Sequence, residues 1–126
     1  MHKFIILLAF ILNISLFGFI HWYYSNNPRT TLVIVDSSFS MSKHWSLVNK
    51  SIQFIDKKHR YDQIYLATDK ADIGIIDPPQ IKLQIPYGKR DLQPVADRYE
   101  HKNNWRHYMI TNADQIPSPY EKILAQ

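Results

Sequence analysis

The chain contains no cysteine, which excludes disulfide bonds and thiolate metal sites. It also lacks a basic stripe with interleaved aromatic residues, although its formal net charge is +4. We therefore expect no nucleic-acid partner. No internal repeat or low-complexity region is evident. A length of 126 residues suits one small domain with an accessory segment.

Charged residues are missing from segment 4–20, which reads FIILLAFILNISLFGFI. At about 1.5 Å rise per residue a helix of this length covers roughly 25 Å. With the aromatic residues 22–24 behind it, the segment is long enough to cross a membrane. A cleaved signal peptide is the alternative, but no small-residue cleavage site follows the apolar run. The sequence therefore predicts an uncleaved signal anchor over residues 1–24, in contact with the membrane through residues 4–24.

The basic residues around this anchor predict its orientation. Lys3 precedes the apolar run, whereas Arg29 and Lys43 follow it at a greater distance. The positive-inside rule then favours a cytoplasmic N-terminus in a single-pass membrane protein. The domain would lie outside the cytoplasm, in a periplasm or at a cell surface. Residues 25–29 have the turn chemistry of a polar linker, and residues 30–126 form the domain.

An apolar run at 30–35 ends abruptly in a loop that carries Asp36, Ser38 and Ser40. Continuous hydrophobicity indicates a strand buried on both faces, as in parallel α/β sheets. Open α/β folds place ligand sites at the carboxyl ends of such strands. One carboxylate and two hydroxyls on a tight loop are hard oxygen ligands, which suit Mg²⁺ or Mn²⁺. Asp36, Ser38 and Ser40 are therefore the candidate metal ligands.

The stretch from Thr30 to Met41 resembles the first motif of von Willebrand factor A (vWA) domains, the metal-ion-dependent adhesion site. Its D-x-S-x-S-M pattern lies between an apolar strand and an amphipathic helix, as in that family. The resemblance implies that the Asp and the two Ser residues hold a divalent cation. The open position of that cation would take an acidic side chain from a protein partner. The resemblance covers roughly residues 30–114 and implies a Rossmann-like α/β sheet in a binding module that is not an enzyme.

Apolar spacing predicts a helix over 42–58 and strands over 63–68 and 105–111. A strand, a helix and a strand in succession favour a right-handed crossover between parallel strands. Two β-prone runs, 71–76 and 81–85, suggest a hairpin at a sheet edge, where vWA domains place a short antiparallel strand. The predicted fold is thus a transmembrane helix followed by a small α/β sheet, mostly parallel with an antiparallel edge strand and flanked by helices.

Polar residues at the predicted helix starts and strand ends of this domain are expected to act as caps and turns. Ser40 or Ser42 is expected to cap the helix after the first strand, and Asp91 to cap a helix that begins at Leu92. Asp69 ends the second strand beside the Asp36 loop and is expected to be an ordinary turn residue, with a supporting acid of the site as the alternative. A brief helix is expected from Pro119.

Segment 86–95 resembles the Gly-Gly-Thr-Asp loop of many vWA-like domains. Gly88 and Asp91 match that loop, but Arg90 stands where the family has its metal-binding Thr. A guanidinium close to a divalent cation is strongly repelled. Arg90 is therefore expected either to pair with Asp36 in the place of the cation or to point to solvent.

The strand over 105–111 is followed by a second departure from the family pattern. Asn112 stands where the family has the Asp of a Thr-Asp-Gly-like turn, so one negative charge is lost. Asp114 lies two residues further on and could substitute only along a different loop path. Arg90, Asp91, Asn112 and Asp114 are thus candidates for supporting or substitute roles at the site.

Three functions remain open from the sequence. The first is a membrane-anchored vWA-like protein-binding module that uses a divalent cation. The second is a degenerate haloacid-dehalogenase-like phosphatase with Asp36 as nucleophile, although Ser38 stands where those enzymes have a second acid. The third is a small anchored structural protein in which Arg90 neutralises Asp36 without metal. Because full vWA domains continue with further strand–helix units, the chain is expected to be a reduced version or a fragment with an open sheet edge that invites a partner.

Overall fold

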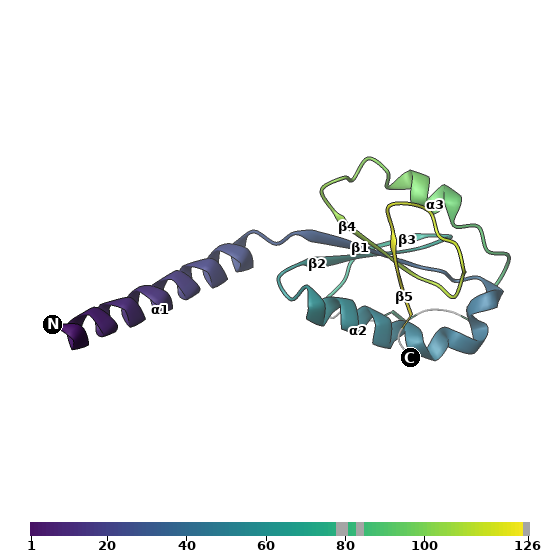
Figure 1. The fold of residues 1–126 in the computed structure, drawn as a ribbon. Coiled ribbons are helices and arrows are strands. Elements are labelled where there is room, and N and C mark those ends of the chain that lie inside the picture. Colours follow the sequence, from purple (N-terminus) through teal and green to yellow (C-terminus); the bar gives the residue numbers. More distant parts are fainter. Residues whose placement is uncertain (78–80, 83–84, 125–126) are drawn as a thin grey trace.

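The computed structural model describes residues 1–77, 81–82 and 85–124, which form one long helix and an α/β domain (Figure 1). The helix α1 spans His2–Asn26. The domain contains five strands in the order β3-β2-β1-β4-β5. In chain order its elements are β1 (Thr30–Val35), the 3₁₀ helix η1 (Phe39–Leu47), α2 (Val48–Lys58), β2 (Gln63–Thr68), β3 (Asp72–Ile75), α3 (Gln93–Arg98), β4 (Arg106–Ile110) and β5 (Glu121–Ile123).

Helix α1 is long and apolar enough to cross a membrane, and none of its residues is buried by the domain. The helix continues to Asn26, two residues beyond the predicted end of the anchor. Side-chain amides account for this extension, because Asn26 donates to the Trp22 carbonyl at 2.8 Å and Asn27 to the Tyr23 carbonyl at 2.9 Å. The Tyr23 carbonyl also accepts from the Asn27 backbone amide at 3.0 Å, so side-chain and backbone donors together close the end of the helix. The connection to β1 is therefore shorter than the predicted linker.

The sheet is mostly parallel, as predicted. The central strand β1 pairs in parallel with β2 on one side and with β4 on the other. Strand β3 pairs antiparallel with β2 and forms one edge, which confirms the expected antiparallel edge strand. Of the second β-prone run, 81–85, residues 83–84 lie outside the described residues.

The other edge of the sheet differs from the prediction. The segment expected to form a brief helix from Pro119 instead contains β5, which pairs in parallel with β4 through Tyr108, Met109 and Ile110. The reason for this difference is a tertiary contact with β4. The outer side of β4 offers unpaired backbone groups, and pairing with them satisfies β5 better than a short helix without a core contact would.

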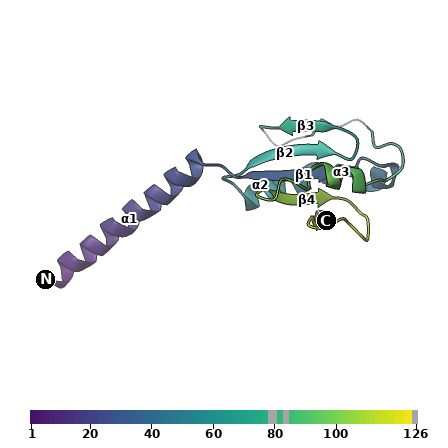
Figure 2. The same cartoon turned by 90° about the horizontal axis from the view of Figure 1, so that it is seen from above.

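The two faces of β1 contribute to two separate cores, which explains its continuous apolar sequence. Val33 and Val35 pack with residues of η1 and α2, including Met41, Ile52 and Ile55. On the opposite face, Leu32 and Ile34 pack with a second group that includes Val95, Ala96, Tyr99 and Met109. Helix α2 thus covers one face of the sheet and α3 the other (Figures 1 and 2). Burial on both faces makes β1 the rigid centre of the domain.

The helical segment after β1 is α-helical only in its second half, so the predicted α-helix over 42–58 is partly wrong. Its first half is the 3₁₀ helix η1. Neither Ser40 nor Ser42 caps an α-helix here, because α2 begins at Val48 with Leu47 as its N-cap. Ser42 Oγ instead donates to the Phe39 carbonyl at 2.6 Å. The Phe39 amide donates to the Gly88 carbonyl at 3.0 Å, so a contact with a distant loop determines how this segment begins.

Candidate functional site

The candidate site lies where three parallel strands end side by side. Val35 is in register with Thr68 of β2 and with Ile110 of β4. The residues that follow these three positions are Asp36, Asp69 and Thr111. Carboxyl ends of parallel strands form the edge at which open α/β folds bind ligands. We refer to this edge, with the loops 36–40, 69–70, 86–90 and 111–112, as the rim.

Asp36 is the most buried carboxylate of the rim, with none of its side chain exposed. Its Oδ1 accepts a hydrogen bond from the Ser38 amide at 3.0 Å. Its Oδ2 accepts from Thr111 Oγ1 at 2.6 Å and from Arg90 Nε at 2.7 Å. Burial by itself raises the pKa of Asp36, but the hydrogen bonds from Ser38, Thr111 and Arg90 outweigh it, so the pKa lies below its ordinary value. Asp36 is therefore held as a carboxylate.

Arg90 pairs with Asp36, which was one of the two arrangements predicted for it. The pair forms a salt bridge between a fully buried carboxylate and a guanidinium whose side chain is 28% exposed. Arg90 Nη2 also donates to Asn112 Oδ1, and Asn112 Nδ2 donates to the Ser40 carbonyl at 3.0 Å. Arg90 thus connects the loop after β1 to the loop after β4. The structure brings together Asp36, Ser38, Arg90 and Asn112 of the predicted site residues.

Two other predicted site residues lie apart from this cluster. Asp91 is exposed and does not cap α3, which begins at Gln93 with Leu92 as its N-cap. Burial of the Leu92 side chain against the sheet accounts for this shift, because it fixes the path of the loop. Asp114 is exposed too and makes no hydrogen bond or ion pair within residues 1–77, 81–82 and 85–124. It does not substitute for the acid that Asn112 replaces.

The two serines of the predicted metal motif differ in their surroundings. Ser38 is fully buried, and its hydroxyl finds no hydrogen-bond partner in the described part of the chain. Ser40 is exposed at the start of η1, and its carbonyl accepts the bond from Asn112. The unpaired Ser38 hydroxyl is a feature that a bound cation would satisfy. Against this, both lone-pair directions of Asp36 Oδ2 are used by Arg90 and Thr111.

The residues as arranged therefore do not fit a divalent cation at Asp36. The positive charge that the carboxylate needs is supplied by Arg90 at hydrogen-bond distance, and a metal ion there would be repelled by the same guanidinium. No cluster of three or more His, Asp or Glu side chains suited to a metal occurs among the described residues.

Asp69 belongs to the rim, as in the alternative prediction of a supporting acid and not as the ordinary turn residue that was favoured. Only 2% of its side chain is exposed. Its Oδ1 accepts hydrogen bonds from the amide and the hydroxyl of Ser37, and its Oδ2 accepts from Lys70 Nζ at 2.7 Å. Lys70 Nζ also donates to Ser37 Oγ at 3.1 Å. The signal in the sequence was the position of Asp69 after a strand parallel to β1, which places it beside the Asp36 loop.

The loop 86–90 is held to the loop after β1 by backbone hydrogen bonds. The Tyr87 amide donates to the Ser37 carbonyl at 2.9 Å, and the Gly88 carbonyl accepts from Phe39. Gly88 has a φ of +76°, a conformation that favours glycine. Together these contacts explain why Arg90 reaches Asp36, although its loop follows an edge strand.

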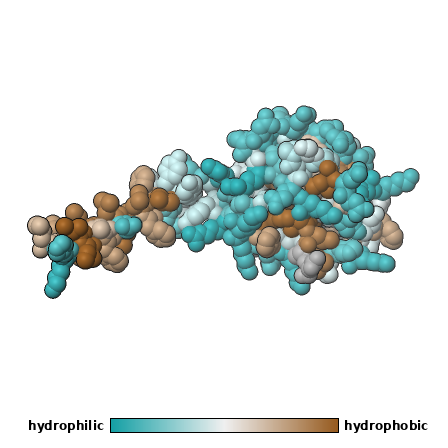
Figure 3. Space-filling view, viewed as in Figure 1, coloured by the Kyte–Doolittle hydropathy of each residue, from teal (hydrophilic) through white to brown (hydrophobic). Residues whose placement is uncertain are grey.

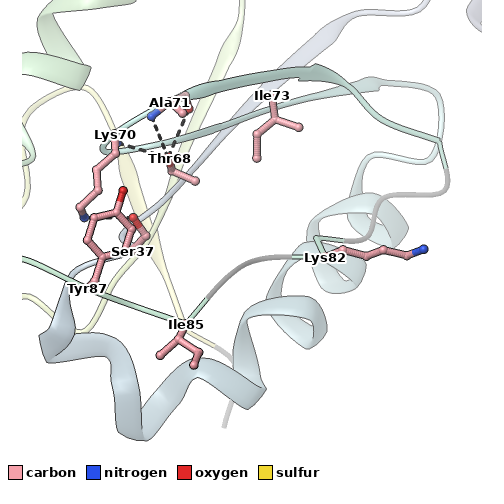
Figure 4. Close-up of a pocket in the computed structure, with 8 residues that line it drawn as sticks. All are labelled: Ser37, Thr68, Lys70, Ala71, Ile73, Lys82, Ile85 and Tyr87. Carbon is pink, nitrogen blue, oxygen red and sulfur yellow. Dashed lines mark hydrogen bonds between the residues drawn. The ribbon is translucent and has the colours of Figure 1, made fainter.

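Large apolar side chains are exposed around this polar centre. Phe39 is 72% exposed, Tyr87 56% and Ile85 84%. Tyr87 and Ile85 line an open pocket of about 300 Å³ together with Ser37, Thr68 and Lys70. Figure 4 shows Tyr87 and Lys70 side by side at one end of this pocket, while Lys82 points away from it; Lys70 Nζ lies 4.9 Å from the centre of the Tyr87 ring. The rim thus combines a paired buried charge with an exposed apolar border.

Comparisons with protein families, with curated proteins and with solved structures find no match to this chain.

Proposed function

We propose that this chain is a membrane-anchored protein-binding module of vWA-like architecture in which Arg90 takes the place of the divalent cation. The contact between Arg90 and Asp36 carries this proposal. In the resemblance described above, an ion held by the acid after the first strand binds an acidic side chain of the partner. Here a guanidinium is bound to the equivalent carboxylate and remains partly exposed, with 28% of its side chain in contact with solvent.

Arg90 has the capacity to bind such an acidic group. Its Nε and Nη2 are directed to Asp36 and Asn112, and no hydrogen bond from Nη1 is found within the described residues. Charge-assisted hydrogen bonds between Arg and carboxylates are among the stronger polar contacts in proteins. The exposed Phe39 and Tyr87 on the adjoining loops supply the aromatic contacts that are enriched at the centres of protein interfaces. The partner is thus a protein with an Asp or Glu near an apolar patch.

The anchor is part of the same proposal. Helix α1 would cross the membrane with its N-terminus in the cytoplasm, and the domain would lie on the other side, close to the bilayer. The phosphatase alternative gains no support, because Ser38 occupies the position of the acid that it requires.

Site-specific photo-crosslinking in the native membrane tests the binding role. A photoreactive amino acid replaces Phe39 at the rim and, as a matched control, Phe54 on α2, which is also an exposed phenylalanine. A discrete protein adduct is expected from position 39 only. It should weaken several-fold in Arg90→Gln, and the crosslinked peptide should contain an acidic residue. Identical adducts from both positions would contradict a binding surface at the rim.

A further inference from the structure

We propose that the junction between α1 and the domain binds the phosphate group of an anionic membrane lipid. This surface lies at the opposite end of β1 from Asp36, where the chain enters the domain at Thr30 (Figure 1). The inference relies on the membrane anchor proposed above, but not on the protein-binding role of the rim.

Tyr61 holds α1 against the turn that follows α2. Its hydroxyl is 2.7 Å from His21 Nδ1, and its ring stacks on Tyr24 with a centroid distance of 5.9 Å. Arg60 Nη2 donates to the Tyr61 hydroxyl at 2.7 Å, and the Arg60 guanidinium lies over the Tyr61 ring. The last turns of α1 therefore face the C-terminal end of α2, as both ribbon views show (Figures 1 and 2).

The space between the two elements is a pocket of about 460 Å³ with two unlike walls. Phe17 and Ile20 of α1 form the apolar wall. Cationic side chains form much of the other wall: Arg29, Lys57, Lys58, Arg60 and Arg106. The hydropathy surface changes at this junction from the mainly hydrophobic α1 to a mainly hydrophilic domain (Figure 3). A ligand that fills the pocket would have an apolar part and an anionic part.

The positive charge of this pocket is only partly compensated from within the protein, where Lys58 Nζ lies 3.6 Å from Glu121 Oε1. Asp62 is the one acid among its described lining residues, and its Oδ2 already accepts hydrogen bonds from Arg106 Nε at 3.0 Å and Thr31 Oγ1 at 2.7 Å. No side-chain hydrogen bond or ion pair of Arg29 or Lys57 is found in the described ranges. Two exposed cations are thus available to an external anion beside the apolar wall.

A lipid explains both walls better than a soluble anion does. Phe17 and Ile20 belong to the helix that would lie among acyl chains, and the aromatic residues Trp22, Tyr23 and Tyr24 would place the following turn at headgroup depth. Basic residues next to a membrane are attracted to anionic headgroups by about 1 kcal/mol each, which corresponds to about five-fold in affinity. Inorganic phosphate would use the cations but leave the apolar wall without a partner.

Lipid retention by the full-length chain tests this inference. The protein is reconstituted in four-to-one phosphatidylcholine–phosphatidylglycerol vesicles, extracted in mild detergent and examined for bound lipid by native mass spectrometry. The wild type should retain phosphatidylglycerol in preference to phosphatidylcholine. The variant Arg29→Gln/Lys57→Gln should lose this retention by at least about five-fold. The control Lys43→Gln/Lys50→Gln removes the same charge from exposed positions outside the pocket and should retain lipid like the wild type.

Further measurements distinguish a failure of the membrane anchor from a failure of the lipid site. Alkaline extraction of the vesicles reports insertion, and release of the wild type would overturn the anchor itself. An inserted protein without preference for phosphatidylglycerol, or with equal loss in both double variants, would overturn the lipid site alone. Inorganic phosphate should not displace the lipid at millimolar concentration, and displacement would assign the pocket to a soluble anion. Equal thermal unfolding of all three proteins in phosphatidylcholine is expected, because the four substituted side chains are exposed.

Discussion

Arg90 Nε lies 2.7 Å from Asp36 Oδ2, although the two residues are 54 positions apart in the chain. This contact joins a loop that follows an edge strand to the end of the central strand. It gives the buried carboxylate a positive partner that belongs to the chain itself.

The substitution Arg90→Gln should destabilise the domain. It leaves Asp36 buried without its counter-charge, and loss of one partner of a buried pair costs about 3 kcal/mol. The partial exposure of Arg90 keeps the loss at the lower end of the range known for such pairs. Chemical unfolding in detergent micelles measures the change in free energy. Lys89→Gln, one residue earlier and exposed, is the control and should leave the unfolding free energy unchanged.

Stability should fall with acid because of Asp36. The pKa of Asp36 is lower in the folded chain than its ordinary value of 3.8. The unfolded state therefore binds the proton more readily, so this contribution is present above pH 3.8 and is lost as the pH falls toward the lower folded pKa. The variant Asp36→Asn should unfold with a shallower acid dependence, whereas Asp114→Asn, at an exposed acid, should follow the wild type. Parallel acid curves for Asp36→Asn and the wild type would contradict the depressed pKa.

Divalent cations should not stabilise the wild type, whereas Arg90→Thr/Asn112→Asp should gain metal-dependent stability. The double change removes the guanidinium and restores the residue types of the family pattern around the unpaired Ser38 hydroxyl. A metal at one hundred times its Kd would add about 2.7 kcal/mol to the free energy of unfolding. Thermal unfolding with Mg²⁺ or Mn²⁺ measures this gain. Adding Ser38→Ala to the double variant should remove it, and strong stabilisation of the wild type would instead assign the cation to the native protein.

Asp69→Ala should destabilise the rim independently of Arg90. The change leaves the Ser37 amide and the Lys70 ammonium without their carboxylate partner. An unpaired group in a part-buried position costs about 1–3 kcal/mol. Faster hydrogen exchange at Ser37 and a lower free energy of unfolding are expected. Asp72→Ala, at an exposed acid on β3, is the matched control, and equal exchange at Ser37 in both variants would refute the role of Asp69.

The features that the sequence predicted well are those that depend on local pattern. Strands β1 and β2 lie at their predicted bounds, and β4 lies within a residue of its predicted bounds at each end. For β1 the physical reason is burial on both faces, which leaves an unbroken apolar run. The pairing of Arg90 with Asp36 was predicted as one of two arrangements, since a cation at that loop position must either neutralise the acid or avoid it. The vWA resemblance itself remains a prediction.

The features that were missed depend on contacts between distant segments. Asp69 is part of the rim because parallel pairing places the end of β2 beside Ser37. The favoured prediction was an ordinary turn residue, because the local pattern around Asp69 does not distinguish it from the alternative role of a supporting acid. Strand β5 forms because the outer side of β4 is available, although the segment after Pro119 has no strong strand pattern of its own. The 3₁₀ start of the helical segment likewise follows from the bond between Phe39 and Gly88.

If α1 crosses a membrane as proposed, the length and direction of β1 set how far from the bilayer a partner would meet Asp36. The strand begins next to α1 and ends at the rim, and its six residues cover roughly 20 Å. A neighbour embedded in the same bilayer would meet Arg90 only if it projected by at least that height, whereas a freely diffusing protein would approach without obstruction. In the proposed membrane arrangement, the domain would therefore favour partners that extend at least this far from the bilayer or that are not anchored in it.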